Sequence, residues 1–192
     1  MNLNEQELVQ RARLGDEAAF EALFELHAPS LNRLACAMAG NASDGEDALQ
    51  EAFLGAFERL DSFESRSSFK TWLSRILMNQ VARQRRSKRV REVVRSVDFS
   101  AESQALLKGA GSQGLGDALG HADDTGNSAI RMDVSAALER LSDEFRQVVV
   151  LREIEGLSYS EIADVLNVPQ GTVESRLFRA RAELRRLLKD YL

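Results

Sequence analysis

The sequence predicts an all-α protein made of two small helical domains. No segment sustains the apolar/polar alternation that marks a strand, and apolar residues recur instead at spacings of three and four. Only 2 prolines occur in 192 residues, which favours helices. A glycine-rich stretch separates two periodic parts. We therefore expect a domain of residues 1–96, a flexible acidic linker of residues 97–130 and a domain of residues 131–192.

The first domain is expected to begin with two helices. Asn4 and Glu7 have the spacing of a capping box and start a short helix. A second helix is expected from residue 17 to about residue 39. It should be kinked or interrupted near Pro29, because proline removes a backbone donor from the helix.

A third helix is expected after Ser43 and Glu46, which repeat the capping spacing. Its apolar face consists of Leu49, Phe53, Phe57 and Leu60. Away from that stripe, facing solvent or a partner, lie Asp47, Gln50, Glu51 and Leu54. Taken alone, these residues favour a solvated acidic face over a binding surface.

A fourth helix should follow the polar loop of residues 63–68. Its buried side is expected to contain Phe69, Trp72, Leu73, Ile76, Leu77 and Val81. On another face, at spacings of four, four and three, lie Arg75, Asn79, Arg83 and Arg86. One helix thus combines an aromatic core with a basic ridge. Trp72 is expected to belong to the core first and to any surface contact second.

The second domain contains a helix-turn-helix pattern. Ser158 and Glu161 form a capping box, and the break at residues 167–169 ends in a proline suited to the start of a helix. The buried stripe of the next helix is Val173, Leu177, Ala180, Leu184 and Leu187. Gly171 is expected to let the two helices approach closely.

The second helix of this motif directs a polar set outward, and these side chains can reach base edges and phosphates. The set includes Gln170, Glu174, Ser175, Phe178 and Arg179. An ordinary helical hairpin with a solvated charged face is the alternative. The combination of cap, turn and apolar stripe favours the nucleic-acid-binding motif.

Charge is unevenly distributed, although the net charge is −5. Acidic residues dominate residues 1–64, whereas residues 83–95 and the last helix are strongly basic. Two basic patches on an acidic body predict weak binding to free DNA, since the acidic remainder opposes phosphate contacts. A protein partner for the acidic surface is therefore expected.

Several classes of protein are disfavoured. Cys36 is the only cysteine, so no internal disulfide or multi-cysteine zinc site is possible, and we expect a buried structural thiol. His27 and His121 lack partners at metal-ligand spacing, and no cofactor or metal is expected. No acid–base pair, activated nucleophile or phosphate loop suggests an enzyme. No apolar run approaches the ~20 residues of a membrane span, so a cytoplasmic protein without membrane insertion is expected.

In both domains the sequence resembles the extracytoplasmic-function (ECF) sigma factors, the small two-domain members of the bacterial sigma factor family. In the second domain the resemblance rests on EGLSYSEIA (155–163) and GTVESRLFRAR (171–181). In the first it rests on DALQEAFL (47–54), LDSF (60–63) and FKTWLSRILMN (69–79). Both blocks, in this order and separation, are highly specific.

The resemblance implies a subunit that joins core RNA polymerase and directs it to promoters. The acidic face of the third helix, with Asp47, Gln50, Glu51 and Leu54, would dock on the β′ coiled coil, and the β subunit would be a further contact. The promoter −10 element would meet the loop and fourth helix through Phe63, Trp72, Arg75, Asn79, Arg83 and Arg86. The −35 element would meet Gln170, Thr172, Glu174, Ser175, Phe178 and Arg179.

Further expectations follow from the same resemblance. The linker would pass through the polymerase cleft, although an inert tether is nearly as well supported. An anti-sigma factor would restrain the protein, which would be a monomer when free. Glu174 stands where many members carry lysine or arginine, and Gly55 at a position that is often basic. These departures affect which promoter bases are chosen.

A free-standing helix-turn-helix regulator is the alternative function. Such a protein binds duplex operator DNA, usually as a dimer on two half-sites. The chain has no evident dimerisation segment and has two DNA-facing patches joined by a tether, which disfavours this alternative.

Overall fold

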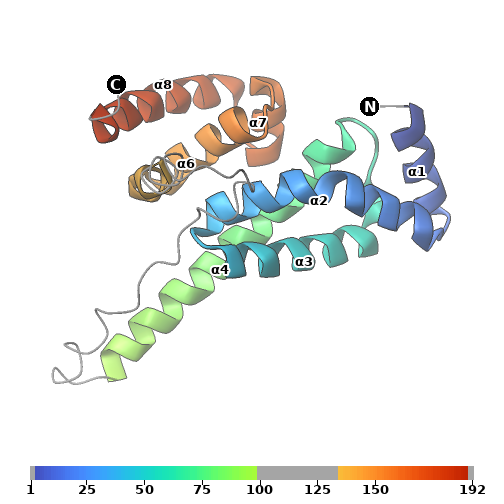
Figure 1. The fold of residues 1–192 in the computed structure, drawn as a ribbon, viewed down its shortest axis with the longest axis horizontal. Helices are drawn as coiled ribbons and strands as arrows, with labels where there is room; N and C mark the ends of the chain where they lie inside the picture. Colours follow the sequence, from blue (N-terminus) through green and yellow to red (C-terminus); the bar gives the residue numbers. More distant parts are fainter. Residues whose placement is uncertain (1–2, 99–133, 190–192) are drawn as a thin grey trace, which may run out of the picture.

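The computed structural model describes residues 3–98 and 134–189, with side chains described for residues 5–91 and 134–189. Within these ranges all regular structure is helical, as the sequence predicts (Figure 1). The expected linker, residues 97–130, lies outside the described residues except for positions 97 and 98, which continue the preceding helix. His121 also lies outside them, and the domain boundaries stay predictions.

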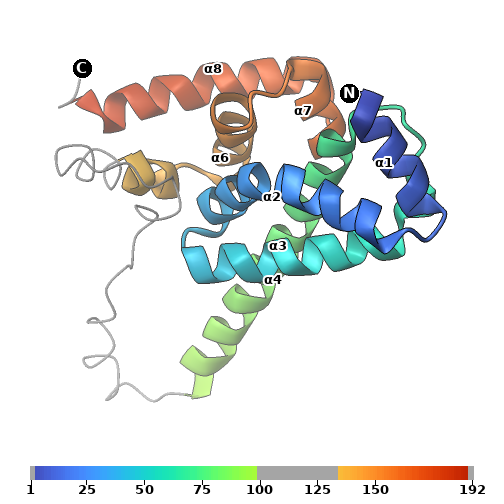
Figure 2. The ribbon, with the colours of Figure 1, turned by 45° about the vertical axis from the view of Figure 1, so that its right-hand side comes forward.

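The N-terminal part is a bundle built around a long second helix. Its elements are α1 (Leu3–Arg13), α2 (Glu17–Ala39), α3 (Ala42–Glu58), a single 3-10 turn (Leu60–Ser62) and α4 (Phe69–Asp98). The helix α2 packs against α1, α3 and α4. At its C-terminal end α4 extends beyond the bundle (Figures 1 and 2).

Two helix boundaries differ from the sequence-based expectations. Helix α2 is not interrupted at Pro29 but continues to Ala39. Helix α3 is capped by Asn41 rather than Ser43: the Asn41 side chain accepts a hydrogen bond from the Asp44 backbone N–H at 2.9 Å. Because the left-handed Gly40 (φ 90°) turns the chain at once into an extended Asn41, Ser43 already lies inside the helix.

The core of this bundle contains a cluster of three rings. The centroids of Phe63 and Phe69 are 5.4 Å apart, and Trp72 lies 5.4 Å from Phe63 and 5.5 Å from Phe69. Phe63 and Phe69 are fully buried, whereas Trp72 is half-buried. The Phe63–Phe69 pair is edge-to-face and the two pairs with Trp72 are tilted, and together they fix the loop before α4 against the start of that helix.

Gly45 marks the closest approach of α2 and α3. A Cβ atom at Gly45 would lie 2.7 Å from both the backbone nitrogen and the Sγ of Cys36. The Cys36 side chain is buried, which confirms the expected structural thiol, and burial raises the pKa of that thiol. Only glycine allows the two helices to meet at this distance.

His27 is buried in α2, with its Nε2 3.3 Å from a carboxylate oxygen of Glu5. Burial lowers the pKa of His27 below its ordinary value of 6.5, although Glu5 opposes the shift. The unfolded chain therefore takes up this proton at a higher pH than the folded chain. The stability that depends on neutral His27 is complete above pH 6.5 and decreases as the pH falls toward the folded pKa.

We accordingly expect the melting temperature of the native protein to fall between about pH 7 and about pH 5, where histidine titrates. In His27→Gln this dependence should be weaker, because glutamine does not titrate. Thermal melts followed by circular dichroism in buffers of equal ionic strength measure the difference. If the melting temperatures of the two proteins depended equally on pH, His27 would not be the source of this dependence.

The C-terminal part is a second small helical unit. Residues 134–140 are helical, followed by α6 (Asp143–Val149), a π-helical stretch (Val150–Ile154), α7 (Tyr159–Leu166) and α8 (Gln170–Leu187). Arg146 holds the C-terminal end of the helix at residues 134–140 in place. Its buried guanidinium donates to the backbone oxygens of Leu138, Glu139 and Leu141 at 2.8, 2.7 and 3.3 Å.

The helix-turn-helix is formed as predicted. Ser158 and Glu161 make the full capping box, and a left-handed Asn167 (φ 52°) ends α7. On α8 the predicted stripe lies inward, with Val173, Leu177 and Ala180 buried. The role expected for Gly171 is wrong: it is exposed, and a Cβ there would meet nothing within 4 Å.

Candidate protein and nucleic-acid interfaces

The first candidate surface is the outer face of α3. Its inner positions are buried, which leaves four side chains exposed together: Asp47, Gln50, Glu51 and Leu54. Leu54 is 62% exposed. Among the described side chains, neither Asp47 nor Glu51 is in an ion pair. Free carboxylates around an exposed leucine suit a partner that is both basic and apolar.

A shallow groove of about 340 Å³ borders this face. It lies between α2 and α3 and is lined in part by Phe24, Pro29, Leu49 and Gln50. The groove extends the apolar component of the surface beyond Leu54. Sequence periodicity could not have predicted it, because the groove depends on how two helices pack.

The second candidate surface is the outer ridge of α4. Because Phe69, Leu73 and Leu77 are buried on the inner side, the four predicted residues of the ridge are all exposed. These are Arg75, Asn79, Arg83 and Arg86. The ridge therefore presents guanidinium groups around a carboxamide that can both donate and accept.

The aromatic residues expected beside this ridge do not share one role. Phe63 lies in the core, only 1% exposed, so its ring is not on the surface in this structure. The reason is local, since the loop carries the ring inward against Phe69 and Trp72. Trp72 is half-buried and packs against the core. This agrees with the expectation that Trp72 is first a core residue and only second a surface contact.

The third candidate surface is the outward face of α8. Gln170, Glu174, Ser175, Phe178 and Arg179 are exposed, and Thr172 is half-buried. Phe178 is 78% exposed, which is unusual for an aromatic side chain. Gln170 Nε2 donates to Glu174 Oε1 at 3.0 Å, so these two side chains form one hydrogen-bonded unit at the start of the helix.

Two other arginines of α8 form ion pairs with carboxylates of the C-terminal part. Arg176 Nη2 lies 2.9 Å from Glu144 Oε1, and Arg181 Nη2 lies 2.7 Å from Glu153 Oε1. The hydrogen bond from Arg181 to Glu153 raises the pKa of Arg181. Arg176 thus links α8 to α6, and Arg181 links α8 to the π-helical stretch.

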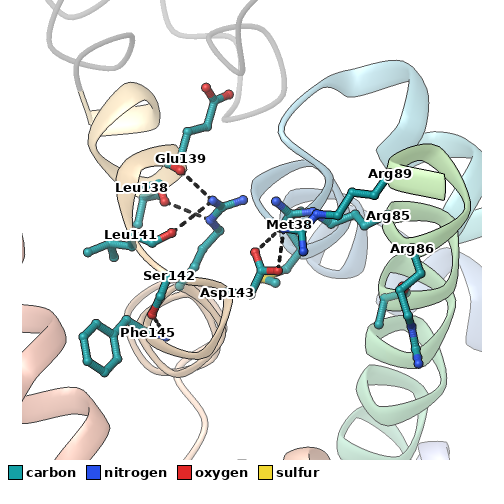
Figure 3. Close-up of polar contacts among 12 residues, drawn as sticks. Met38, Arg85, Arg86, Arg89, Leu138, Glu139, Leu141, Ser142, Asp143 and Phe145 are labelled. Carbon is teal, nitrogen blue, oxygen red and sulfur yellow. Dashed lines mark hydrogen bonds and ion pairs between the residues drawn. The ribbon is translucent and has the colours of Figure 1, made fainter. Parts of the chain in front are cut away.

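A set of contacts between the two parts was not predicted. Asp143, at the start of α6, accepts from Arg85 and Arg89 of α4, as Figure 3 shows. Glu155 pairs with Lys70 at the other end of the contact. The basic run was visible in the sequence, but nothing there indicates which carboxylates face it.

Other kinds of site find little support. Among residues 3–98 and 134–189, no three His, Cys, Asp or Glu side chains are grouped so that they could hold a metal ion. No helix in the same ranges has the length and apolar character needed to cross a bilayer.

Comparison with protein families gives two matches. The description "Sigma-70 region 2" matches residues 23–91, and "Sigma-70, region 4" matches residues 131–184. The ECF RNA polymerase sigma factor SigW of Bacillus subtilis is 31% identical over 182 residues, which covers 95% of each chain. The ECF RNA polymerase sigma-E factor of Escherichia coli K12 is 34% identical over 183 residues, covering 93% of this chain and 91% of its own.

Solved structures agree with these matches. The sigma factor RpoE from Bartonella quintana, in complex with the anti-sigma factor NepR, superposes with a TM-score of 0.69 at 31% identity, covering 88% of this chain and 96% of that one. CnrH, in complex with the cytosolic domain of CnrY, gives a TM-score of 0.67 at 27% identity, with coverage of 97% and 98%.

Proposed function

This chain belongs to the extracytoplasmic-function (ECF) RNA polymerase sigma factors. On that premise we propose which of its surfaces binds the polymerase and which bind the two promoter elements. It is a transcription initiation factor that binds core RNA polymerase and recognises promoter DNA. The observation that carries this function is the presence of both sigma regions in a chain that matches ECF relatives along more than nine-tenths of its length. Its place of action is the cytoplasm, where the polymerase works.

The α3 face is the docking surface for the polymerase. Its exposed Asp47 and Glu51, which form no ion pair among the described side chains, suit a basic coiled coil, and the exposed Leu54 together with the adjoining groove offers apolar contact. The β′ coiled coil is the partner assigned to this face, with the β subunit as a further contact of the chain.

The α4 ridge engages the −10 element. Strand opening needs no catalytic residue, because binding energy for the unpaired strand offsets the cost of unstacking. Asn79 is the base-edge reader on this ridge, and Arg75, Arg83 and Arg86 hold phosphates. The accessible part of Trp72 contacts the melted strand, whereas Phe63 supports the loop from inside.

The outward face of α8 reads the −35 element in duplex form. Arg179 and Ser175, both exposed, would contact base edges and phosphates, and the exposed Phe178 would offer an apolar surface to a thymine methyl group. Glu174, oriented by Gln170, can accept from a cytosine amino group. Thr172 lies at the rim of this surface.

Run-off transcription with purified core polymerase on a genomic fragment library tests the function. We expect new transcript starts that depend on this protein and that share two upstream elements. Identical starts with and without the protein would refute it. Gel filtration and gel shift address the alternative, since a free-standing regulator would be a dimer with tight, sequence-specific duplex binding.

Asn79→Ala should reduce open-complex formation by about tenfold, the cost of losing one good base contact. Binding to core polymerase should be unchanged, because Asn79 is exposed on α4 and is not one of the residues of the α3 face. Permanganate footprinting measures opening, and co-purification measures core binding. Ser87→Ala, an exposed change on the same helix, is the control. Equal loss of both activities would assign Asn79 a structural role.

Arg179→Ala should weaken initiation at promoters that depend on the −35 element by about tenfold, since a lost base or phosphate contact costs roughly that much. Run-off transcription on promoters with an intact or a scrambled −35 element measures the effect. Arg185→Ala, exposed further along α8, serves as the matched arginine control. Unchanged promoter selectivity would remove Arg179 from the reading surface.

An anti-sigma factor completes the proposed set of partners. The supporting observation is the likeness to a sigma factor that was solved together with its anti-sigma factor. A pull-down from the native host should recover a small regulatory protein in addition to polymerase. Recovery of polymerase alone would count against this partner.

A further inference from the structure

In the described parts of the chain, helix α8 presents its outward face to solvent. Figures 1 and 2 both place α8 along the outer edge of the C-terminal part, with α6 and α7 on its inner side. The helix packs against α6 and α7 through its buried stripe. The hydrogen-bonding groups on its exposed face therefore decide which bases of a duplex can lie against it.

Glu174 is held in one orientation by the residue one turn before it. Gln170 Nε2 donates to Glu174 Oε1 at 3.0 Å, and both side chains are exposed. The amide must be oriented in this way, because the opposite orientation would place two oxygen atoms together. Among the described side chains Glu174 forms no ion pair. Gln170 occupies one carboxylate oxygen, and the other oxygen is left to accept from a ligand.

Ser175 adds a second acceptor beside Glu174. Its hydroxyl donates to the backbone oxygen of Thr172 at 3.0 Å. Because a hydroxyl has a single proton, the Ser175 oxygen can then only accept from a ligand. Glu174 and Ser175 together offer no donor to the acceptor groups of guanine or thymine.

The arginines of α8 do not neutralise this acceptor pair. Arg176 is directed to Glu144, with Nη2 2.9 Å from Oε1. Arg179, the first exposed arginine of the outward face, follows Glu174 by more than one helical turn. The outward face thus presents acceptors first and a guanidinium further along the helix.

The four bases respond differently to a carboxylate in the major groove. Cytosine exposes an amino donor and no acceptor. Adenine exposes an amino donor beside the acceptor N7, guanine exposes the acceptors N7 and O6, and thymine exposes the acceptor O4. A carboxylate therefore accepts from cytosine but faces at least one acceptor in each other base. Repulsion of the wrong bases adds to the attraction of the right one.

We infer that Glu174, held by Gln170, selects a C·G pair at one position of the −35 element by accepting from the cytosine amino group and repelling the acceptors of the other bases. The inference rests on the proposed function, because it assigns α8 to the −35 duplex. Gln170 acts as a positioning residue, since a carboxylate that is already oriented loses less side-chain freedom when DNA binds.

Transcription from a promoter library tests this assignment. Holoenzyme assembled from core polymerase and the full chain transcribes promoters whose −35 element is randomised, each promoter carrying a transcribed barcode. At one position the native protein should favour one orientation of a C·G pair about tenfold over the other three pairs, the value of one good base contact. Glu174→Ala should lose this preference and keep the preferences at the other positions.

Two further variants identify the chemistry at that position. Glu174→Gln should replace the preference for cytosine by one for adenine, because an amide can accept from the adenine amino group and donate to N7. Gln170→Ala should reduce the preference for cytosine several-fold without favouring a new base, because the carboxylate is still present but is no longer held.

Asp164→Asn is the matched control for charge. It removes one exposed carboxylate from α7 instead of α8. Transcription from all promoters should change alike in this variant, and the base preferences should stay as in the native protein. Melting temperatures followed by circular dichroism check that each variant is folded, and preferences are compared as ratios between promoters, so a partial loss of active protein cancels.

Two results would overturn the inference. If Glu174→Ala kept the native preference at every position, Glu174 would serve only to stabilise the start of α8. If the position that responds to Glu174→Ala favoured an A·T pair in the native protein, the carboxylate would not accept from cytosine. Scrambling the whole −35 element tests the proposed function separately: native transcription that is indifferent to scrambling would refute the assignment of α8, whereas a strong dependence with no response to Glu174→Ala refutes the inference alone.

Discussion

Replacing Arg146 by methionine is expected to destabilise the C-terminal part by about 3 kcal/mol, because three backbone acceptors lose a charged donor in a buried setting. The Arg146 side chain is only 3% exposed, and its guanidinium spans the end of the helix at residues 134–140 and the connection to α6. Methionine fills a similar volume but donates no hydrogen bond. Loss of these hydrogen bonds should weaken the packing of the helices that hold α8 in position.

Urea unfolding of the purified variant, followed by circular dichroism, measures this change. Arg140→Met is the matched control, because Arg140 is exposed and the same chemical change there removes no buried donor. We expect that control to unfold within about 0.5 kcal/mol of the native protein. If both variants were equally stable, the three carbonyl contacts of Arg146 would not be what holds this segment.

Gly45→Ala is expected to destabilise the N-terminal part by about 2 kcal/mol, although alanine is the better helix former. The added Cβ would lie 2.7 Å from the Cys36 backbone nitrogen and 2.8 Å from its Cα. Backbone atoms cannot rotate away, so α2 and α3 would have to separate. That separation would also disturb the α3 face that is assigned to the polymerase.

The same helix offers a control substitution, Gly55→Ala, that should change stability in the opposite direction. A Cβ at Gly55 would meet nothing within 4 Å, so Gly55→Ala should stabilise α3 by about 1 kcal/mol through helix propensity alone. Thermal and urea unfolding of both variants should move in opposite directions. Stabilisation by both substitutions would mean that the contact between Gly45 and Cys36 relaxes without cost.

Much of the fold was predictable because it depends on local chemistry. The capping box at Ser158 and the apolar stripe of α8 follow from spacing, and both are confirmed. The cap of α3 was placed at Ser43 because that residue satisfies the same pattern. Asn41 takes the role because a left-handed Gly40 ends α2 immediately before it.

The predicted surfaces were recognised where a side chain's exposure follows from helical periodicity, as for Asn79 and Phe178. Periodicity gives no guidance in a loop, or where packing between separate segments decides the outcome. Phe63 turns inward with its loop, and Gly171 faces open space rather than α7. The partners of Asp143 and Glu155 lie more than 50 residues away in sequence, and no local pattern identifies them.

If α8 reads the −35 element as proposed, its ion pairs affect how its affinity for DNA depends on ionic strength. Arg176 and Arg181 are already matched with Glu144 and Glu153, so few condensed cations would be released through them when α8 enters the major groove. Each phosphate neutralised adds roughly 0.9 to the slope of log affinity against log salt concentration. The affinity should consequently depend less steeply on salt concentration than the number of arginines in α8 alone suggests.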